Sequence, residues 1–245
     1  MVKKTVQTDM KRIKEIACML LYMDISPTTI ESITSHPFTN SWYVKIPGKQ
    51  RGGLEMLDLH DCKAQDKWRM CLSEQINQSS LTNILKAMNK QYILCFLKIA
   101  NPHISDIDLA ETLRYFWSDI EHINDDVNVK TREIVSMFKR ADINTLMNGT
   151  EREVFHNFGA EVTLYRGVTS YNEKNKKALS WTIDYNKAVW FANRFQTGDG
   201  KVWEITIPNN RILCYFNTRN EKEVIIDPYN LNVEIKIQEI WDEIP

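Results

Sequence analysis

The last third of the chain contains an arginine whose position would allow its side chain to bind a phosphate. Arg166 follows the apolar run 162–165 and is itself followed by Gly167. A guanidinium can bind phosphate oxygens through two parallel hydrogen bonds, and a glycine lets a ligand approach the backbone closely. Arg166 and Gly167 are therefore a candidate site for an anionic ligand at the end of a strand.

Two pairs of polar residues follow, each with a spacing of two. Ser180 and Thr182 flank Trp181, while Glu221 and Glu223 flank a lysine directly before an apolar run. Residues two apart on an extended strand point to the same face. We therefore expect the two hydroxyls on one face, with Trp181 on the other, and the two carboxylates side by side. Carboxylates placed in this way can stabilise a positive charge or accept a proton.

Each segment also has an ordinary interpretation. Arg166 would be a surface arginine paired with an acidic neighbour, and Ser180 and Thr182 would be hydroxyls on an edge strand. The two glutamates would be the ends of a solvated turn. The order of the three segments, together with the strand pattern around each of them, favours a shared site instead.

In this order the three segments resemble the catalytic set of the arginine-serine-glutamate class of ADP-ribosyltransferases, and specifically its toxin-like bacterial or phage type. The resemblance covers about residues 160 to 228 and includes the strand Ala178-Leu179-Ser180-Trp181-Thr182, the helical stretch 185–192 and the strand 221–226. It implies an α+β fold with a mixed β core of two small sheets around an NAD cleft. It also implies a transferase that uses NAD as co-substrate and needs no metal.

The resemblance implies a role for each polar residue. Glu223 would bind the ribose next to nicotinamide and stabilise the oxocarbenium-like charge that forms as nicotinamide departs. Glu221 would act on the acceptor as a base or hydrogen-bond acceptor, and in this class a double glutamate is associated with guanidino acceptors such as arginine. Five residues would bind NAD: Arg166, Gly167, Ser180, Thr182 and Phe195.

The resemblance also implies two functional loops. The segment 196–201 would close over the dinucleotide, with Phe195 at its root as a stacking ring. The turn 216–220 would recognise the acceptor, with Tyr215 or Phe216 presenting an aromatic face and Asn217 contributing a polar contact.

Hydrophobic periodicity predicts the elements that position these residues. Residues 1–102 have mainly helical spacing. We expect one helix to start at Ser26-Pro27, a strand or hairpin at 42–48, and a helix over 81–99 that ends at Asn101-Pro102. Further helices are expected from Ser105, at 129–139, 150–158 and 184–195. Strands are expected at 162–165, 180–182, 202–207, 211–216 and 223–226.

This pattern suggests two regions. Residues 1–102 would recognise an acceptor or partner, and residues 103–245 would form the catalytic domain, with a strand-rich core from about residue 160 to the end. The family resemblance leaves the first region without an assigned role.

Composition limits the alternatives. The chain has 245 residues, 43% of them hydrophobic and 26% charged, which is typical of a folded globular protein. Its formal net charge of -1 argues against a global attraction to nucleic acid or anionic membranes and leaves local basic patches open. The run Lys45–Arg51, close to Trp42 and Tyr43, is the best candidate in the sequence for an RNA or partner surface.

Cysteine usage and hydropathy favour the cytoplasm. The five cysteines are scattered and contain no C-x-x-C pair, so they indicate neither a disulfide framework nor a zinc site. No apolar run approaches the roughly 20 residues of a membrane-spanning helix. We therefore expect no membrane partner.

Taken with the resemblance, the sequence predicts a mono-ADP-ribosyltransferase toxin or effector whose acceptor is an arginine in a protein. The alternative within the same chemistry is a nucleic acid acceptor such as mRNA, in a toxin-antitoxin or anti-phage setting. An antitoxin or inhibitor protein is a further candidate partner. The alternative of another class is a catalytically inactive relative that serves as a binding module.

Overall fold

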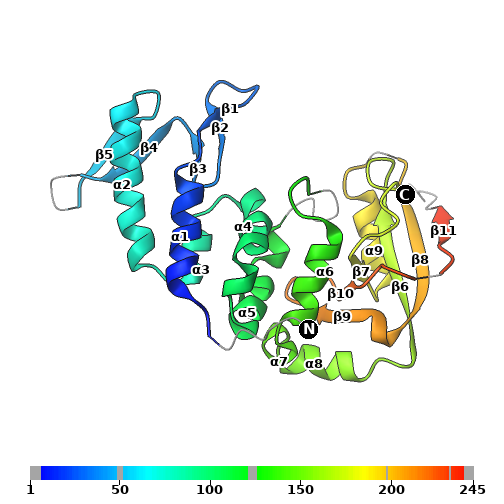
Figure 1. Ribbon diagram of the computed structural model, residues 1–245. Coiled ribbons are helices and arrows are strands. Elements are labelled where there is room, and N and C mark those ends of the chain that lie inside the picture. The colour runs from blue at the N-terminus through cyan, green and yellow to red at the C-terminus, as the bar shows by residue number, and fades with distance from the viewer. Residues whose placement is uncertain (1–6, 49–51, 121–125, 197, 232, 240–245) are drawn as a thin grey trace. The chain divides into compact units, whose positions relative to one another are not determined.

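The computed structural model describes residues 7–48, 52–120, 126–196, 198–231 and 233–239. The chain divides into two compact units. Unit 1 comprises Met1–Asp108 and Phe116–Glu121, and unit 2 comprises Leu109–Tyr115 and His122–Pro245. Both units contain helices and antiparallel strands, so the chain is α+β as predicted (Figure 1).

Helix α1 lies at the centre of unit 1 and packs on three other helices of that unit. Asp9 caps its start by accepting a hydrogen bond from the backbone N–H of Arg12 (3.1 Å). Its apolar face is fully buried at Ile13, Ala17 and Leu21. The helical elements are α1 (Met10–Leu21), α2 (Cys62–Gln78), α3 (Leu81–Lys86), η1 (Lys90–Tyr92), α4 (Ile93–Ala100) and η2 (Asn101–His103).

The described part of unit 1 also contains a three-stranded and a two-stranded antiparallel sheet. The strands are β1 (Ser26–Pro27), β2 (Ile33–His36), β3 (Thr39–Ser41), β4 (Tyr43–Pro47) and β5 (Leu54–Asp58). The hairpin of β4 and β5 confirms the strand predicted near residue 44. The prediction that a helix starts at Ser26-Pro27 is wrong, because these two residues form β1. The Thr28 hydroxyl donates to the carbonyl oxygen of Ile33 (2.9 Å) and closes a turn between β1 and β2.

The single helix predicted over residues 81–99 is divided into α3, η1 and α4. The division lies at Asn89, whose backbone is extended. Its N–H donates to the carbonyl oxygen of Pro37 (2.8 Å), and its side chain donates to that of His36 (2.7 Å). These hydrogen bonds to a distant segment take the place of hydrogen bonds within a helix. Tertiary contacts therefore interrupt the helix that the continuous hydrophobic pattern predicts.

The described part of unit 2 combines helices with a six-stranded sheet, ordered β11-β8-β6-β7-β10-β9. Helix α5, followed by η3, contributes residues to both units. Helix α9 packs on β6, while α6 and α8 pack on β9. The helical elements that lie wholly or partly in unit 2 are α5 (Asp106–Phe116), α6 (Thr131–Arg140), α7 (Ile143–Leu146), α8 (Gly149–His156), α9 (Tyr185–Asn193) and η4 (Asn209–Arg211), whereas η3 (Trp117–Asp119) belongs to unit 1.

The sheet consists of two halves that meet at one residue pair. β6 pairs with β8 over its whole length, and β10 pairs with β7 on one side and β9 on the other. β6 and β7 pair antiparallel where Tyr165 lies opposite Thr182. The two sheets expected from the sequence are therefore joined into one. Its strands are β6 (Glu161–Val168), β7 (Ser180–Thr182), β8 (Lys201–Pro208), β9 (Ile212–Phe216), β10 (Glu223–Ile226) and β11 (Lys236–Glu239).

Candidate functional site

Three residues singled out in the sequence form one hydrogen-bonded row across three strands. Nη1 of Arg166 on β6 donates to the carbonyl oxygen of Ser180 on β7 (2.5 Å). The hydroxyl of Ser180 donates in turn to Oε1 of Glu223 on β10 (2.5 Å). All three residues are half-buried. The guanidinium thus contacts the backbone of Ser180, and the hydroxyl of the same serine contacts the carboxylate of Glu223.

The register of β7 and β10 explains how the serine reaches the glutamate. Glu223 lies opposite Thr182, and Ile225 lies opposite Ser180. Ser180 is therefore the diagonal neighbour of Glu223 on the same face, a separation that side chains can bridge. Trp181 is buried on the other side, where its indole N–H donates to the carbonyl oxygen of Ala178 (2.9 Å). The predicted alternation of this strand is confirmed.

Thr182 is engaged with the backbone. Its hydroxyl donates to the carbonyl oxygen of Glu221 (2.8 Å) and accepts a hydrogen bond from the N–H of Asp184 (3.0 Å). Only 4% of the residue is exposed. Thr182 thus fixes the backbone of the first glutamate and the entry to α9, whereas Ser180 contacts the carboxylate of the second.

Gly167 lies where β6 and α9 approach most closely. A Cβ atom at this position would be 2.2 Å from the carbonyl oxygen of Ala188 and 2.5 Å from the nitrogen of Ala192. Both atoms belong to the backbone of α9 and cannot rotate away. The glycine is therefore required for packing of the helix on the sheet, a role that the sequence analysis did not assign to it.

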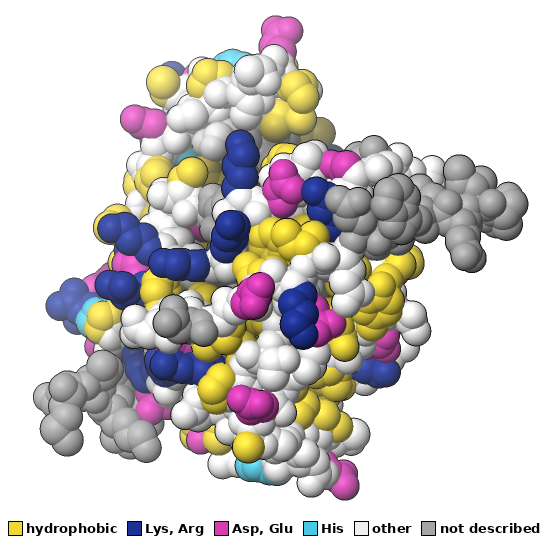
Figure 2. Space-filling model, turned by 90° about the vertical axis from the view of Figure 1, so that its right-hand side faces the viewer, with side chains coloured by type: hydrophobic (Ala, Val, Ile, Leu, Met, Phe, Trp, Pro, Cys, Tyr) yellow, Lys and Arg dark blue, Asp and Glu magenta, His cyan; other side chains and the backbone are white. Residues whose placement is uncertain are grey.

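Phe195 follows α9 and is 66% exposed. The guanidinium of Arg194 lies over its ring, 4.5 Å from the centroid. Figure 2 shows that hydrophobic side chains are exposed among charged ones on one face of the molecule. Beyond Phe195 the loop turns with positive φ at Gln196 and Gly198, and Asp199 Oδ2 accepts a hydrogen bond from the N–H of Ser170 (2.8 Å). Residue 197 of the predicted lid lies outside the described residues.

The two glutamates are not consecutive outward positions of one strand. β10 begins at Glu223, and Lys222 has a left-handed backbone with φ 48°. A left-handed residue breaks the period of two. We therefore correct the prediction that an extended strand sets Glu221 and Glu223 side by side, because Glu221 belongs to the preceding turn.

Lys222 is held from two directions. Its Nζ lies 2.8 Å from Oδ2 of Asp184, the residue that caps α9. Its backbone N–H donates to Oδ1 of Asn217 (3.1 Å). The hydrogen bond from Lys222 lowers the pKa of Asp184, and the same bond raises the pKa of Lys222. The predicted acceptor residue Asn217 therefore has a structural task in shaping the turn before Glu223.

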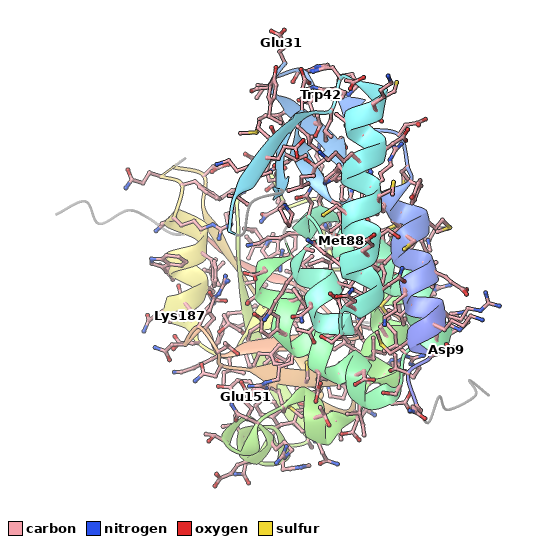
Figure 3. The ribbon with its side chains drawn as sticks, turned by 90° about the vertical axis from the view of Figure 1, so that its left-hand side faces the viewer. Asp9, Glu31, Trp42, Met88, Glu151 and Lys187 are labelled. Atoms are coloured by element: carbon pink, nitrogen blue, oxygen red, sulfur yellow. The ribbon has the colours of Figure 1, made fainter. Side chains whose placement is uncertain are left out.

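Glu151 on α8 anchors the other end of that turn. Its Oε1 accepts a hydrogen bond from the N–H of Asn217 (2.9 Å), and its Oε2 accepts from Arg114 (2.5 Å) and from the N–H of Asn148 (2.8 Å). Only 2% of Glu151 is exposed. Figure 3 labels this residue on α8, a helix that packs on β9.

Burial alone would raise the pKa of Glu151, but the hydrogen bonds from Asn217, Arg114 and Asn148 together lower it below the ordinary value. Glu151 is not among the site residues predicted from the sequence. The signal that would have drawn attention to it is Asn148 followed three residues later by a glutamate, the pattern of a capping box.

Tyr215 and Phe216 are buried, with 4% and 5% of each residue exposed. The ring of Tyr215 lies against Phe158 (centroids 6.1 Å apart), and that of Phe216 lies against Phe138 (6.4 Å). We correct the prediction that these rings face an acceptor, because α6 and α8 cover β9. Burial also raises the pKa of Tyr215.

Comparison with protein-family models, with curated proteins and with solved structures found no match for this chain. Its function therefore has to be argued from its own residues. Among the described residues, no group of three or more His, Cys, Asp or Glu side chains is arranged to hold a metal ion. Within the same residues, no helix is both long enough and apolar enough to cross a membrane.

Proposed function

We propose that the chain is a mono-ADP-ribosyltransferase that transfers ADP-ribose from NAD to a macromolecular acceptor and releases nicotinamide. The row of Arg166, Ser180 and Glu223 on neighbouring strands supports this most directly. We further propose that the six-stranded sheet and α9 are the β core of this enzyme class, with the two halves of the sheet serving as its two small sheets.

The proposed reaction breaks the bond between C1′ of the ribose and the nicotinamide nitrogen. Nicotinamide leaves with the bonding electron pair, so positive charge develops on C1′ and the ring oxygen. The carboxylate of Glu223 stabilises this charge, and the hydroxyl of Ser180 fixes the orientation of that carboxylate. An acceptor nucleophile then forms a bond to C1′ and loses its proton.

Glu221 is the group to which we assign that proton. It is half-buried, and its backbone is fixed by Thr182 two residues before the catalytic strand begins. Glu221 lies in the turn that precedes β10, whereas Glu223 is the first residue of that strand. We assign the two glutamates different tasks: Glu223 acts on NAD and Glu221 acts on the acceptor.

The remaining family residues would bind NAD. Arg166 offers a fork of hydrogen-bond donors for a phosphate, and its hydrogen bond to the carbonyl oxygen of Ser180 connects the phosphate site to β7. The backbone of Gly167 would contact the nicotinamide amide. Phe195, which is exposed and has a ring accessible to a ligand, would stack on NAD.

The first proposed acceptor is an arginine in a protein, and a nucleic acid is the second. The test is to incubate a cell lysate with NAD labelled on its adenylate moiety and to digest the labelled fraction with protease or nuclease. Label removed by protease supports a protein acceptor, whereas label removed only by nuclease identifies a nucleic acid.

Two variants control this experiment. Glu223→Gln keeps the size of the side chain and should abolish labelling. Glu161→Gln removes an exposed carboxylate at the start of β6 and should label as the wild type does. Absence of labelling by the wild-type chain, with NAD still bound, would instead favour an inactive binding module.

A further inference from the structure

Cationic side chains from separate segments of unit 2 surround Tyr229, shortly after the end of β10. The guanidinium carbon of Arg132, on α6, lies 4.9 Å from the centroid of the Tyr229 ring. Nζ of Lys177, from the segment before β7, lies 5.6 Å from the same centroid. Both cationic residues are exposed. One aromatic ring thus holds two positive charges at the surface.

Two further cations meet at the neighbouring Asp227. Nζ of Lys139 lies 2.5 Å from Oδ2 of Asp227, and Nη1 of Arg211 lies 3.8 Å from the same oxygen. Arg211 also donates to the carbonyl oxygen of Tyr229 (3.3 Å). Asp227 is only 5% exposed. The surface around Tyr229 therefore presents several cations, while the carboxylate among them is buried.

The cations beside Tyr229 are only partly paired with carboxylates among the described residues. Among the described residues, neither Arg132 nor Lys177 forms an ion pair with a carboxylate, and both lie against the ring instead. Like charges held beside one ring repel each other, and an anion bound between them would remove that repulsion. The cations gather here although the whole chain has a formal net charge of -1, so the patch is local.

We propose that this surface, formed by Arg132, Lys139, Lys177, Arg211 and Tyr229, binds single-stranded nucleic acid through its phosphates. Several cations from different segments suit a polymer with repeated negative charges. The exposed guanidinium plane of Arg132, supported from below by the Tyr229 ring, adds a surface on which a base can stack. Nucleic acid has bases that can use such a surface, whereas an acidic protein chain does not. This proposal does not depend on ADP-ribosyl transfer.

No linear run in the sequence indicates this surface. The linear pattern favours Lys45–Arg51, where the basic residues are close in the chain and where residues 49–51 lie outside the described part of the structure. The cations around Tyr229 come from α6, from the segment before β7 and from η4, so only the fold brings them together.

The test is fluorescence anisotropy of a labelled, unstructured single-stranded RNA of mixed sequence, titrated with the full chain at several salt concentrations. The charge-reversed variant is Arg132→Glu combined with Lys177→Glu. The matched control is Lys11→Glu combined with Lys63→Glu, which makes the same change in net charge at exposed positions of unit 1. Thermal melts verify that each variant is folded, and Arg132→Gln with Lys177→Gln replaces the reversed pair if it is not.

We expect the wild type and the control to bind alike, and the charge-reversed variant to bind at least roughly tenfold more weakly. The slope of log K against log salt should fall by about two, one for each phosphate that the variant no longer neutralises. Equal RNA affinity of the charge-reversed variant and the control would overturn the proposal. Binding of polyglutamate in place of RNA by the wild type would also overturn it and would indicate an acidic protein partner.

Discussion

The ammonium group of Lys222 lies 2.8 Å from Oδ2 of Asp184, so the residue between the two glutamates is tied to the first turn of α9. The left-handed backbone of Lys222 (φ 48°) turns the chain directly before Glu223. Because a left-handed backbone is unfavourable for residues other than glycine, other contacts must hold Lys222 in this conformation. Three contacts hold Lys222: the ion pair with Asp184, the hydrogen bond from its N–H to Asn217, and the hydrogen bond that its carbonyl oxygen accepts from the N–H of Ile183 (3.2 Å).

Removing this ion pair should impair catalysis without removing a catalytic group. Lys222→Met and Asp184→Asn should each reduce nicotinamide release roughly ten- to a hundredfold, since small displacements of a reacting group have effects of this size. Asparagine still caps α9, so the second variant separates the ion pair from the helix cap. The two substitutions combined should be no worse than either alone, because they remove the same interaction.

Lys222→Arg retains the positive charge and should restore part of the activity. The control is Lys187→Met, which removes a lysine from α9, the helix that Asp184 caps (Figure 3). This variant should leave nicotinamide release unchanged. Wild-type rates in both Lys222→Met and Asp184→Asn would show that the turn keeps its shape without the ion pair.

Gly167→Ala should destabilise the fold by about 3 kcal/mol or more, because its Cβ would meet backbone atoms of α9. Gly149→Ala is the matched control, since nothing lies within 4 Å of a Cβ at that position and alanine is favourable in a helix. Urea unfolding of the two variants measures the difference. Equal midpoints would mean that α9 does not approach β6 as closely as described.

Glu151→Gln should destabilise the fold by about 2 to 3 kcal/mol at neutral pH, because it leaves Arg114 without its carboxylate and weakens the bond from Asn217. The pKa of Glu151 is lowered by folding, so the stability that its ionised form contributes is complete above the ordinary value of 4.5. That contribution is lost as the pH falls below 4.5 through the lowered, folded-state pKa.

Urea unfolding of the wild type and of Glu151→Gln at pH 7 and at pH 3.5 checks this dependence. The difference in unfolding free energy should be smaller at pH 3.5. A difference of the same size at both pH values would mean that the charge of Glu151 contributes nothing.

The row of Arg166, Ser180 and Glu223 could be anticipated because each residue lies on a strand with a clear apolar pattern. The predicted strands around these residues correspond closely to β6, β7 and β10. Once the strands pair, their register sets Ser180 diagonally across from Glu223, and Arg166 reaches the backbone carbonyl oxygen of Ser180.

The position of Glu221 could not be anticipated. A period of two holds only while the backbone stays extended. The left-handed turn at Lys222 depends on Asp184, which is distant in the sequence, and on Asn217, which lies outside the pair of glutamates and the lysine between them. The burial of Tyr215 and Phe216 has a similar origin, since it depends on helices α6 and α8, which precede β9 by many residues. The hydrophobic pattern of a short segment carries no information about these contacts with residues elsewhere in the chain.

The most direct test of the account is nicotinamide release from NAD by the purified chain in the absence of any acceptor. The account predicts that the wild type releases nicotinamide, that Glu223→Gln does so at least about a hundredfold more slowly, and that Glu161→Gln retains the wild-type rate. Equal release by the wild type and Glu223→Gln, or no release by the wild type, would contradict it.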